Sequence, residues 1–131
     1  MAIDMLALRW SPPGRGIFSM GTKLLYERGG ASANNCAAKK VFPETFDSDV
    51  AWITLMLAHG VGVGVECIPR DYRLREPSGQ TLIYVVSDTR EAWAESVQVL
   101  LRSYMDGSNP VRFDYSEIRG EGKPLETFGG T

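Results

Sequence analysis

A long amphipathic segment between two short apolar runs constrains the fold of this chain more than any other feature. Residues 88–105 carry apolar side chains every three or four positions, and Asp88 with Glu91 three residues later forms a capping box. The flanking runs, 82–86 and 110–113, contain the β-branched and aromatic residues typical of strands. The sequence therefore predicts a strand, a helix and a strand, and the apolar face of the helix consists of Trp93, Val97, Leu100, Leu101 and Tyr104.

The first half of the chain shows the same alternation. Cys36 begins a predicted buried strand, and residues 43–58 have the spacing of an amphipathic helix. The alternating glycines and valines of 60–64 predict a second buried strand, whose backbone approaches a neighbour closely. Strands that alternate with helices indicate a mixed α/β fold.

Glycine and proline mark the limits of the remaining segments. Residues 23–28 predict a short helix that Gly29-Gly30 closes. Residues 70–79 are polar and contain a Pro-Ser-Gly turn, which predicts a hairpin or a surface loop. Residues 114–131 are glycine-rich and predict a loop.

Composition and charge exclude several functions. The 131 residues suit a single domain, and 14 basic against 16 acidic residues give a net charge of -2 without a basic cluster, which excludes a general nucleic-acid binder. The longest apolar run, 53–65, is interrupted by His59 and three glycines and is too short to span a bilayer. No secretion signal is recognisable, so we expect a cytoplasmic protein whose two cysteines are free thiols.

The glycine repeat does not match a nucleotide-binding fingerprint. A dinucleotide site needs G-x-G-x-x-G between a strand and a helix, whereas residues 60–64 read G-x-G-x-G after a helix. Gly122-Lys123 is followed by proline instead of Ser or Thr, so it is not a Walker loop. For the repeat, tight packing and contact with a ligand both remain open.

Cys36 has two interpretations on its residues alone. A free cysteine is often a small buried hydrophobe. Asn34 and Asn35 precede it, however, and their amides can bind anionic or hydroxylated groups next to the sulfur.

Cys67 and His59 are interpreted as structural. A disulfide between Cys36 and Cys67 requires their Cα atoms to lie within about 7 Å. The chain contains one histidine, and no His, Cys, Asp or Glu set has the spacing of zinc ligands, so we expect no metal site.

Five segments, in their order and spacing, resemble the class II, adenosylcobalamin-dependent ribonucleotide reductases, in particular the monomeric ribonucleoside-triphosphate branch. They are Leu8-Arg9-Trp10-Ser11-Pro12-Pro13-Gly14-Arg15-Gly16, Met20-Gly21-Thr22, Ala33-Asn34-Asn35-Cys36-Ala37-Ala38, Gly60-Val61-Gly62-Val63-Gly64 and Phe113-Asp114-Tyr115-Ser116-Glu117-Ile118-Arg119. The resemblance implies an amino-proximal part of a reductase-type α/β barrel with a helical or hairpin insertion. Residues 1–66 would be the first barrel elements, 67–113 the insertion and 114–131 the approach to an effector loop.

The resemblance also implies roles for individual residues. Cys36 corresponds to one of the two cysteines that reduce the ribose 2′ carbon and end as a disulfide. Asn35, Gly60 and Gly62 would line the substrate site. Arg119 and Lys123, which on residues alone are a solvated charged surface, would bind a deoxynucleoside triphosphate effector.

The family's radical-bearing cysteine and the partner of Cys36 have no match in this chain. The resemblance therefore implies a complementary reductase chain, a ribonucleotide substrate and a thioredoxin-like reductant. Adenosylcobalamin is the cofactor of the complete enzyme, without implied contact to this chain. We expect the chain alone to be inactive. The alternatives are a non-catalytic nucleotide-binding or assembly module, and a structural domain in which Cys36 is buried and inert.

Overall fold

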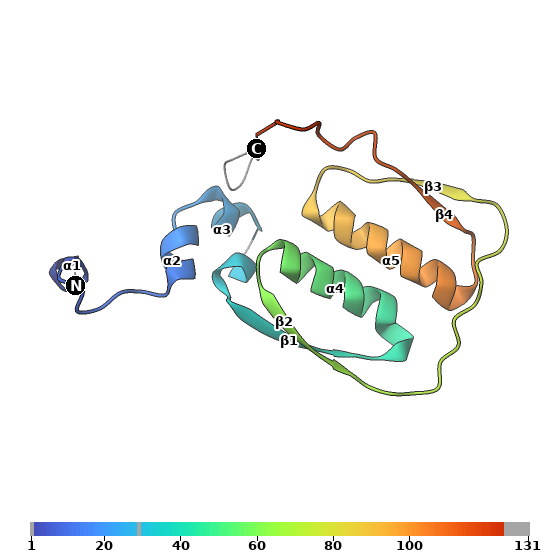
Figure 1. The fold of residues 1–131 in the computed structure, drawn as a ribbon, viewed down its shortest axis with the longest axis horizontal. Coiled ribbons are helices and arrows are strands. Elements are labelled where there is room, and N and C mark those ends of the chain that lie inside the picture. The colour runs from blue at the N-terminus through green and yellow to red at the C-terminus, as the bar shows by residue number, and fades with distance from the viewer. Residues whose placement is uncertain (1, 29, 125–131) are drawn as a thin grey trace.

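The computed structural model describes residues 2–28 and 30–124 (Figure 1). The predicted closing residue Gly29 and the last part of the predicted C-terminal loop, 125–131, lie outside the described residues. The helices are α1 (Ala2–Leu6), α2 (Gly14–Ser19), α3 (Lys23–Arg28), α4 (Phe46–Ala58) and α5 (Arg90–Asp106), the strands are β1 (Cys36–Val41), β2 (Gly62–Cys67), β3 (Leu82–Val85) and β4 (Val111–Asp114), and the 3-10 turns are η1 (Gly30–Ala33) and η2 (Pro43–Thr45).

Two strand–helix–strand units form the main body. β1 pairs with β2 in parallel, with Cys36 opposite Gly62, and α4 connects these strands. β3 pairs with β4 in parallel, with Leu82 opposite Val111, and α5 connects them. The two helices lie side by side between the two strand pairs (Figure 1). The predicted mixed α/β fold is confirmed, and the described residues form two two-stranded sheets and no closed barrel.

The predicted amphipathic helix is α5, but its cap lies one residue later than predicted. Thr89 is the N-cap, and its Oγ1 accepts a hydrogen bond from the Ala92 N–H at 3.1 Å. Gly107 ends the helix in the left-handed conformation, with φ 65°. The prediction that Asp88 caps the helix was wrong. Its carboxylate instead binds the guanidinium of Arg119, because a charged donor binds a carboxylate more strongly than a backbone N–H does.

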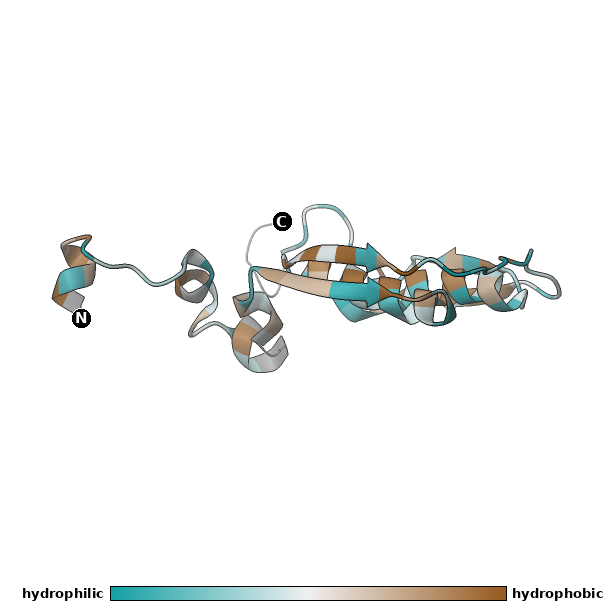
Figure 2. Cartoon of the chain, turned by 90° about the horizontal axis from the view of Figure 1, so that it is seen from below, coloured by the Kyte–Doolittle hydropathy of each residue, from teal (hydrophilic) through white to brown (hydrophobic). Residues whose placement is uncertain are grey.

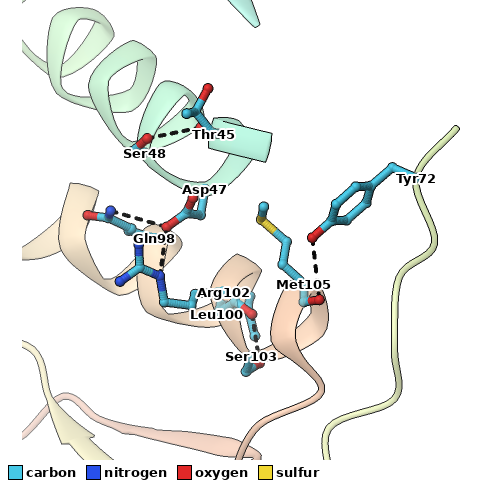
Figure 3. Close-up of polar contacts among 9 residues, drawn as sticks. All are labelled: Thr45, Asp47, Ser48, Tyr72, Gln98, Leu100, Arg102, Ser103 and Met105. Atoms are coloured by element: carbon cyan, nitrogen blue, oxygen red, sulfur yellow. Dashed lines mark hydrogen bonds and ion pairs between the residues drawn. The ribbon is translucent and has the colours of Figure 1, made fainter. Parts of the chain in front are cut away.

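The segment predicted as a hairpin or a surface loop is a loop, since residues 68–81 contain no strand. Two contacts anchor it to the end of α5. The Tyr72 hydroxyl donates to the Met105 carbonyl at 3.4 Å (Figure 3), and the Arg75 N–H donates to the Tyr104 carbonyl at 2.7 Å.

The strands are far more exposed than predicted. In parallel strands, opposite residues share a face. Cys36, Ala38, Gly62 and Gly64 share one face of the β1–β2 pair, and all four are exposed. The other face contacts α4, next to the buried Val41. The prediction of buried strands was wrong because one helix covers only one face of each pair.

The predicted apolar face of α5 is also only partly covered. Trp93 is 43% exposed, Leu100 38% and Tyr104 44%. Tyr115 stacks on Trp93 with ring centroids 5.7 Å apart and rings 20° from parallel. The buried side chains of α5 are small or flexible, which lets its backbone approach a neighbouring helix; they are Ala92, Ala94, Ser96, Ser103 and Met105.

One buried carboxylate joins α4 to α5. Asp47, in the first turn of α4, is 3% exposed. It accepts hydrogen bonds from Arg102 Nε at 3.0 Å and Gln98 Nε2 at 3.2 Å, both on α5 (Figure 3). A carboxylate buried this deeply is stable only when it is paired and hydrogen-bonded, so this contact fixes how the two helices meet.

A second buried carboxylate joins α4 to β1. Asp49 accepts hydrogen bonds from Lys39 Nζ at 2.9 Å, from Thr45 Oγ1 at 2.7 Å and from the Phe42 N–H at 3.2 Å. Burial alone would raise the pKa of Asp49, but these three donors stabilise the carboxylate and lower its pKa below the usual value. Asp49 therefore stays charged and secures the end of the strand that begins at Cys36.

Residues 2–28 form an arm of three short helices, whose N-terminal end lies farthest from the main body (Figure 2). Several of its large apolar side chains are exposed, among them Leu6 at 86% and Leu8 at 90%. Within residues 2–28 and 30–124, no helix is long and apolar enough to cross a membrane.

We expect Asp47→Ala to lower the free energy of unfolding by about 1.5–3 kcal/mol, the usual worth of hydrogen bonds to a charged group. Urea denaturation followed by circular dichroism measures the change. Glu66→Ala is the matched control, because Glu66 pairs with Lys40 at 3.5 Å while both side chains are more than 60% exposed, and such pairs contribute about 0–1 kcal/mol. Equal losses in the two variants would contradict the role of Asp47.

Candidate functional site

The structure brings Asn35, Cys36, Gly60 and Gly62 together at the amino ends of β1 and β2. Cys36 is the first residue of β1, is exposed, and lies opposite Gly62. The Gly62 N–H donates to the Asn35 carbonyl at 2.9 Å. The thiol is therefore accessible, and it lies at the start of a two-stranded sheet.

The three glycines of the repeat are needed for different reasons. Gly60 has φ 77°, a left-handed conformation that other residues rarely adopt. A Cβ at Gly62 would lie 3.6 Å from the Asn35 carbonyl oxygen, and one at Gly64 would lie 3.9 Å from that of Ala37, both ordinary contacts. Strand pairing within the described residues thus leaves room for a side chain at these two positions, and the small residues keep the face beside Cys36 open.

Cys67 lies at the other end of the same strand pair. It is opposite Val41, five residues along the strands from the Cys36–Gly62 pair. At about 3.3 Å per residue and about 4.8 Å between strands, the Cα atoms of the two cysteines are about 17 Å apart, well beyond the reach of a disulfide. Cys67 is exposed and lines an apolar pocket of about 280 Å³, together with Val41, Pro43, Phe46, Ile68, Tyr72 and Leu74.

His59 is buried at the C-terminal end of α4, one residue before Gly60. It is 4% exposed, and its Nδ1 lies 2.7 Å from the Leu55 carbonyl oxygen. Over residues 2–28 and 30–124, no group of three or more His, Cys, Asp and Glu side chains could hold a metal ion.

Arg119 and Lys123 line a separate pocket of about 570 Å³, which follows β4 and adjoins the start of α5. The guanidinium of Arg119 binds the Asp88 carboxylate through two nitrogens, with Nε 2.5 Å from Oδ2 and Nη2 3.1 Å from Oδ1. Its Nη1 also donates to the Pro124 carbonyl at 3.3 Å. These bonds from Arg119 lower the pKa of Asp88. Glu121 lines the pocket too, so two acidic and two basic side chains surround it.

Two contacts at these sites were not predicted from the sequence. Arg15, in the arm, donates to the carbonyls of His59 and Gly60, and Asp88 fixes Arg119. Arg15 belongs to the Pro-Pro-Gly-Arg-Gly segment, which was recognised in the sequence, but nothing in that segment indicates which residues Arg15 contacts. Ion pairs and carbonyl contacts between residues more than 30 positions apart leave no local pattern.

Two curated proteins match this chain over nearly its whole length. A protein of Euglena gracilis named adenosylcobalamin-dependent ribonucleoside-triphosphate reductase is 35% identical over 130 residues, which cover 95% of this chain and 18% of that protein. A protein of Dictyostelium discoideum named probable adenosylcobalamin-dependent ribonucleoside-triphosphate reductase is 36% identical over 145 residues, covering 94% and 19%.

The resemblance to class II ribonucleotide reductases is confirmed. The reductase-like chain spans less than a fifth of the length of these curated relatives. No family model matches it, and no solved structure matches it. The open face beside Cys36 and the pocket at Lys123 are thus features of a segment similar to part of a much larger reductase.

We expect no disulfide between Cys36 and Cys67 in monomers of this reductase-like chain. After mild oxidation with diamide, peptide mapping by mass spectrometry should find both cysteines in the reduced form or linked between two copies, because the two thiols lie at opposite ends of the strand pair. Cys36→Ser identifies the peptides of Cys67. A Cys36–Cys67 linked peptide from monomer would contradict the parallel register of β1 and β2.

Proposed function

We propose that this chain is part of a ribonucleotide reductase and that Cys36 is one of its two reducing cysteines. The main support is that Cys36 is exposed on an open face of small residues. In addition, the chain is similar over nearly its whole length to adenosylcobalamin-dependent reductases. The exposed thiol speaks against the structural alternative, in which Cys36 is buried and inert. Both free thiols fit a reducing, cytoplasmic compartment.

The proposed reaction converts a ribonucleotide to a deoxyribonucleotide with two thiols. The sulfur of Cys36 and a cysteine sulfur of a complementary chain join in a disulfide and release two electrons. Of the two thiol hydrogens, one ends on ribose C2′ and the other on the departing 2′-hydroxyl, which leaves as water. Asn35 would bind a ribose hydroxyl, and the glycine backbone at 60 and 62 would lie against the substrate. A thioredoxin-like reductant then restores the thiols.

A complementary chain is required because this one is incomplete around the site. The open face of β1–β2 is uncovered, and β3 exposes Leu82, Ile83 and Val85 by 52%, 69% and 44%. Unpaired strand edges with apolar side chains favour pairing with further strands. We propose that those strands, and the radical-bearing cysteine that starts the reaction, belong to the complementary chain.

The described residues offer no free histidine to a corrinoid. His59 is the one histidine of the chain, and its ring is buried with Nδ1 2.7 Å from the Leu55 carbonyl oxygen. We therefore assign adenosylcobalamin, which starts the radical chemistry in such enzymes, to the complementary chain, and we derive no step through it.

The pocket after β4 is the proposed effector site. Lys123 would contact the phosphates of a deoxynucleoside triphosphate, and Arg119, already oriented by Asp88, would bind them beside it. This pocket also suits the second candidate function, a non-catalytic nucleotide-binding module, because two basic side chains that can meet phosphate charge, Arg119 and Lys123, line it.

Reductase activity tests the first candidate. Alone, the chain should not reduce ribonucleoside triphosphates. Mixed with the remainder of the Dictyostelium discoideum relative, adenosylcobalamin and dithiothreitol, it should do so. Cys36→Ser should reduce product formation to background, since serine cannot supply the electrons, while Cys67→Ser retains it. Turnover by the chain alone, or an active Cys36→Ser variant, would refute the proposal.

Isothermal titration with deoxynucleoside triphosphates tests the effector pocket. We expect Lys123→Ala to weaken binding about tenfold or more, the usual effect of losing one charged hydrogen bond. Lys40→Ala is the matched control, because Lys40 is an exposed lysine on β1 that pairs with Glu66. Binding without complementation of activity supports the nucleotide-binding module. An unchanged affinity in Lys123→Ala contradicts the pocket assignment.

A further inference from the structure

The turn that follows α4 contains two carbonyls that the helix itself does not use. The Gly60 N–H donates to the Leu57 carbonyl at 2.8 Å, and the Val61 N–H donates to the Met56 carbonyl at 3.0 Å. This pair of bonds is a Schellman motif, which ends a helix with a left-handed glycine. The carbonyls of His59 and Gly60, which follow the last helical residue Ala58, need donors from elsewhere.

Arg15 supplies those donors from the N-terminal arm. Its Nη1 donates to the His59 carbonyl at 3.4 Å, and its Nη2 donates to the Gly60 carbonyl. A planar guanidinium can donate to two acceptors at once, and its positive charge meets the partial negative charge at the end of α4. Arg15 thus completes the cap of a helix that lies more than 40 positions further along the chain.

Gly60 is matched to this arginine. A Cβ at position 60 would lie 2.7 Å from Arg15 Nη1 and 3.1 Å from Nη2, so the guanidinium would have to shift away from the turn. Glycine is therefore favoured by the positive φ and also leaves the guanidinium in its place against the turn. The arginine is fixed on α2, where Ser19, 1% exposed, donates its hydroxyl to the Arg15 carbonyl at 2.5 Å.

The capped turn determines where β2 begins beside the thiol. Two residues after Gly60, the Gly62 N–H bonds to the Asn35 carbonyl and Gly62 lies opposite Cys36. We propose that Arg15 is a positioning residue, which holds the turn of residues 60–62 in register with Cys36. Its relevance to catalysis rests on the proposed function, whereas the contact itself does not.

Hydrogen exchange of the whole chain, read by mass spectrometry with fragmentation to single residues, tests this role. Arg15→Gln should speed exchange of the Val61 and Gly62 amides about tenfold or more, because the turn opens more often without its charged cap. Compared with Arg15→Gln, Arg15→Lys should restore part of the protection of these two amides, since lysine keeps the positive charge but lacks a planar group that donates to both carbonyls. Exchange in the middle of α5 should not change in any variant.

Arg9→Gln is the matched control. Arg9 lies on the same arm and loses the same charge, but its partner is Asp4, at 3.7 Å in an exposed pair. Equal exchange at residues 61 and 62 in wild type and Arg15→Gln, or equal acceleration by Arg9→Gln, would overturn the proposal. A rise of exchange throughout α5 would overturn it too, because it would mean general destabilisation.

Gly60→Ala provides an independent check. It should speed exchange at Gly62 in the wild-type background, because the new Cβ displaces the guanidinium. It should add less in the Arg15→Gln background, where no guanidinium is present to displace. Additive effects would mean that the two residues act separately and would overturn the proposal. Exchange is measured without turnover, so a failed reductase assay and a failed exchange experiment remain distinguishable.

Discussion

The buried carboxylate of Asp47 is the contact on which the two halves of the main body depend. Each half is one helix on one pair of strands, which is too little to enclose a core by itself. The halves meet through α4 and α5, and the small side chains on α5 let the helices approach closely. Dispersion between small residues gives little direction, so the bonds from Arg102 and Gln98 to Asp47 define the register of the two helices.

Packing the helices against each other leaves the strands as the outer layer. The face that carries Cys36 is open because α4 covers the opposite face of that strand pair. The other long helix, α5, packs against α4 and the β3–β4 pair and does not cover the open face. Apolar side chains on β3 and on the Trp93 face of α5 therefore remain in solvent. Exposed apolar surface of this extent is typical of an interaction site, and the unpaired strand edges beside it favour a further strand as the partner.

The order of helices and strands could be predicted from the sequence, because each element carries its own periodicity. The spacing of apolar residues located α4 and α5, and the short apolar runs located β3 and β4. Burial could not be predicted in the same way. An apolar pattern records which face of an element prefers to be covered, and Val65 and Ile83 carry that preference although the described chain leaves them 50% and 69% exposed.

The polar contacts of the candidate sites were the least predictable part. Asp88 had the right spacing for a cap, yet an arginine 31 positions away competes for the same carboxylate and prevails. The glycine repeat was recognisable as a close approach, but only the structure separates Gly60, which has a positive φ and lies against Arg15, from Gly62 and Gly64, where strand pairing leaves space. Sequence patterns record local preferences, and these contacts are decided by partners distant in sequence.

The two candidate sites lie in different units, which limits how one could influence the other. Cys36 belongs to the β1–α4–β2 unit, and the pocket of Lys123 borders the β3–α5–β4 unit. Coupling between sites needs an element with two arrangements that both sites bias. Within the described chain the units meet mainly at the α4–α5 interface, where a buried carboxylate with two donors favours a single arrangement. If an effector at Lys123 alters a reaction at Cys36, the movable element must therefore come largely from outside the described residues, for example from the proposed complementary chain on the exposed strands of both units.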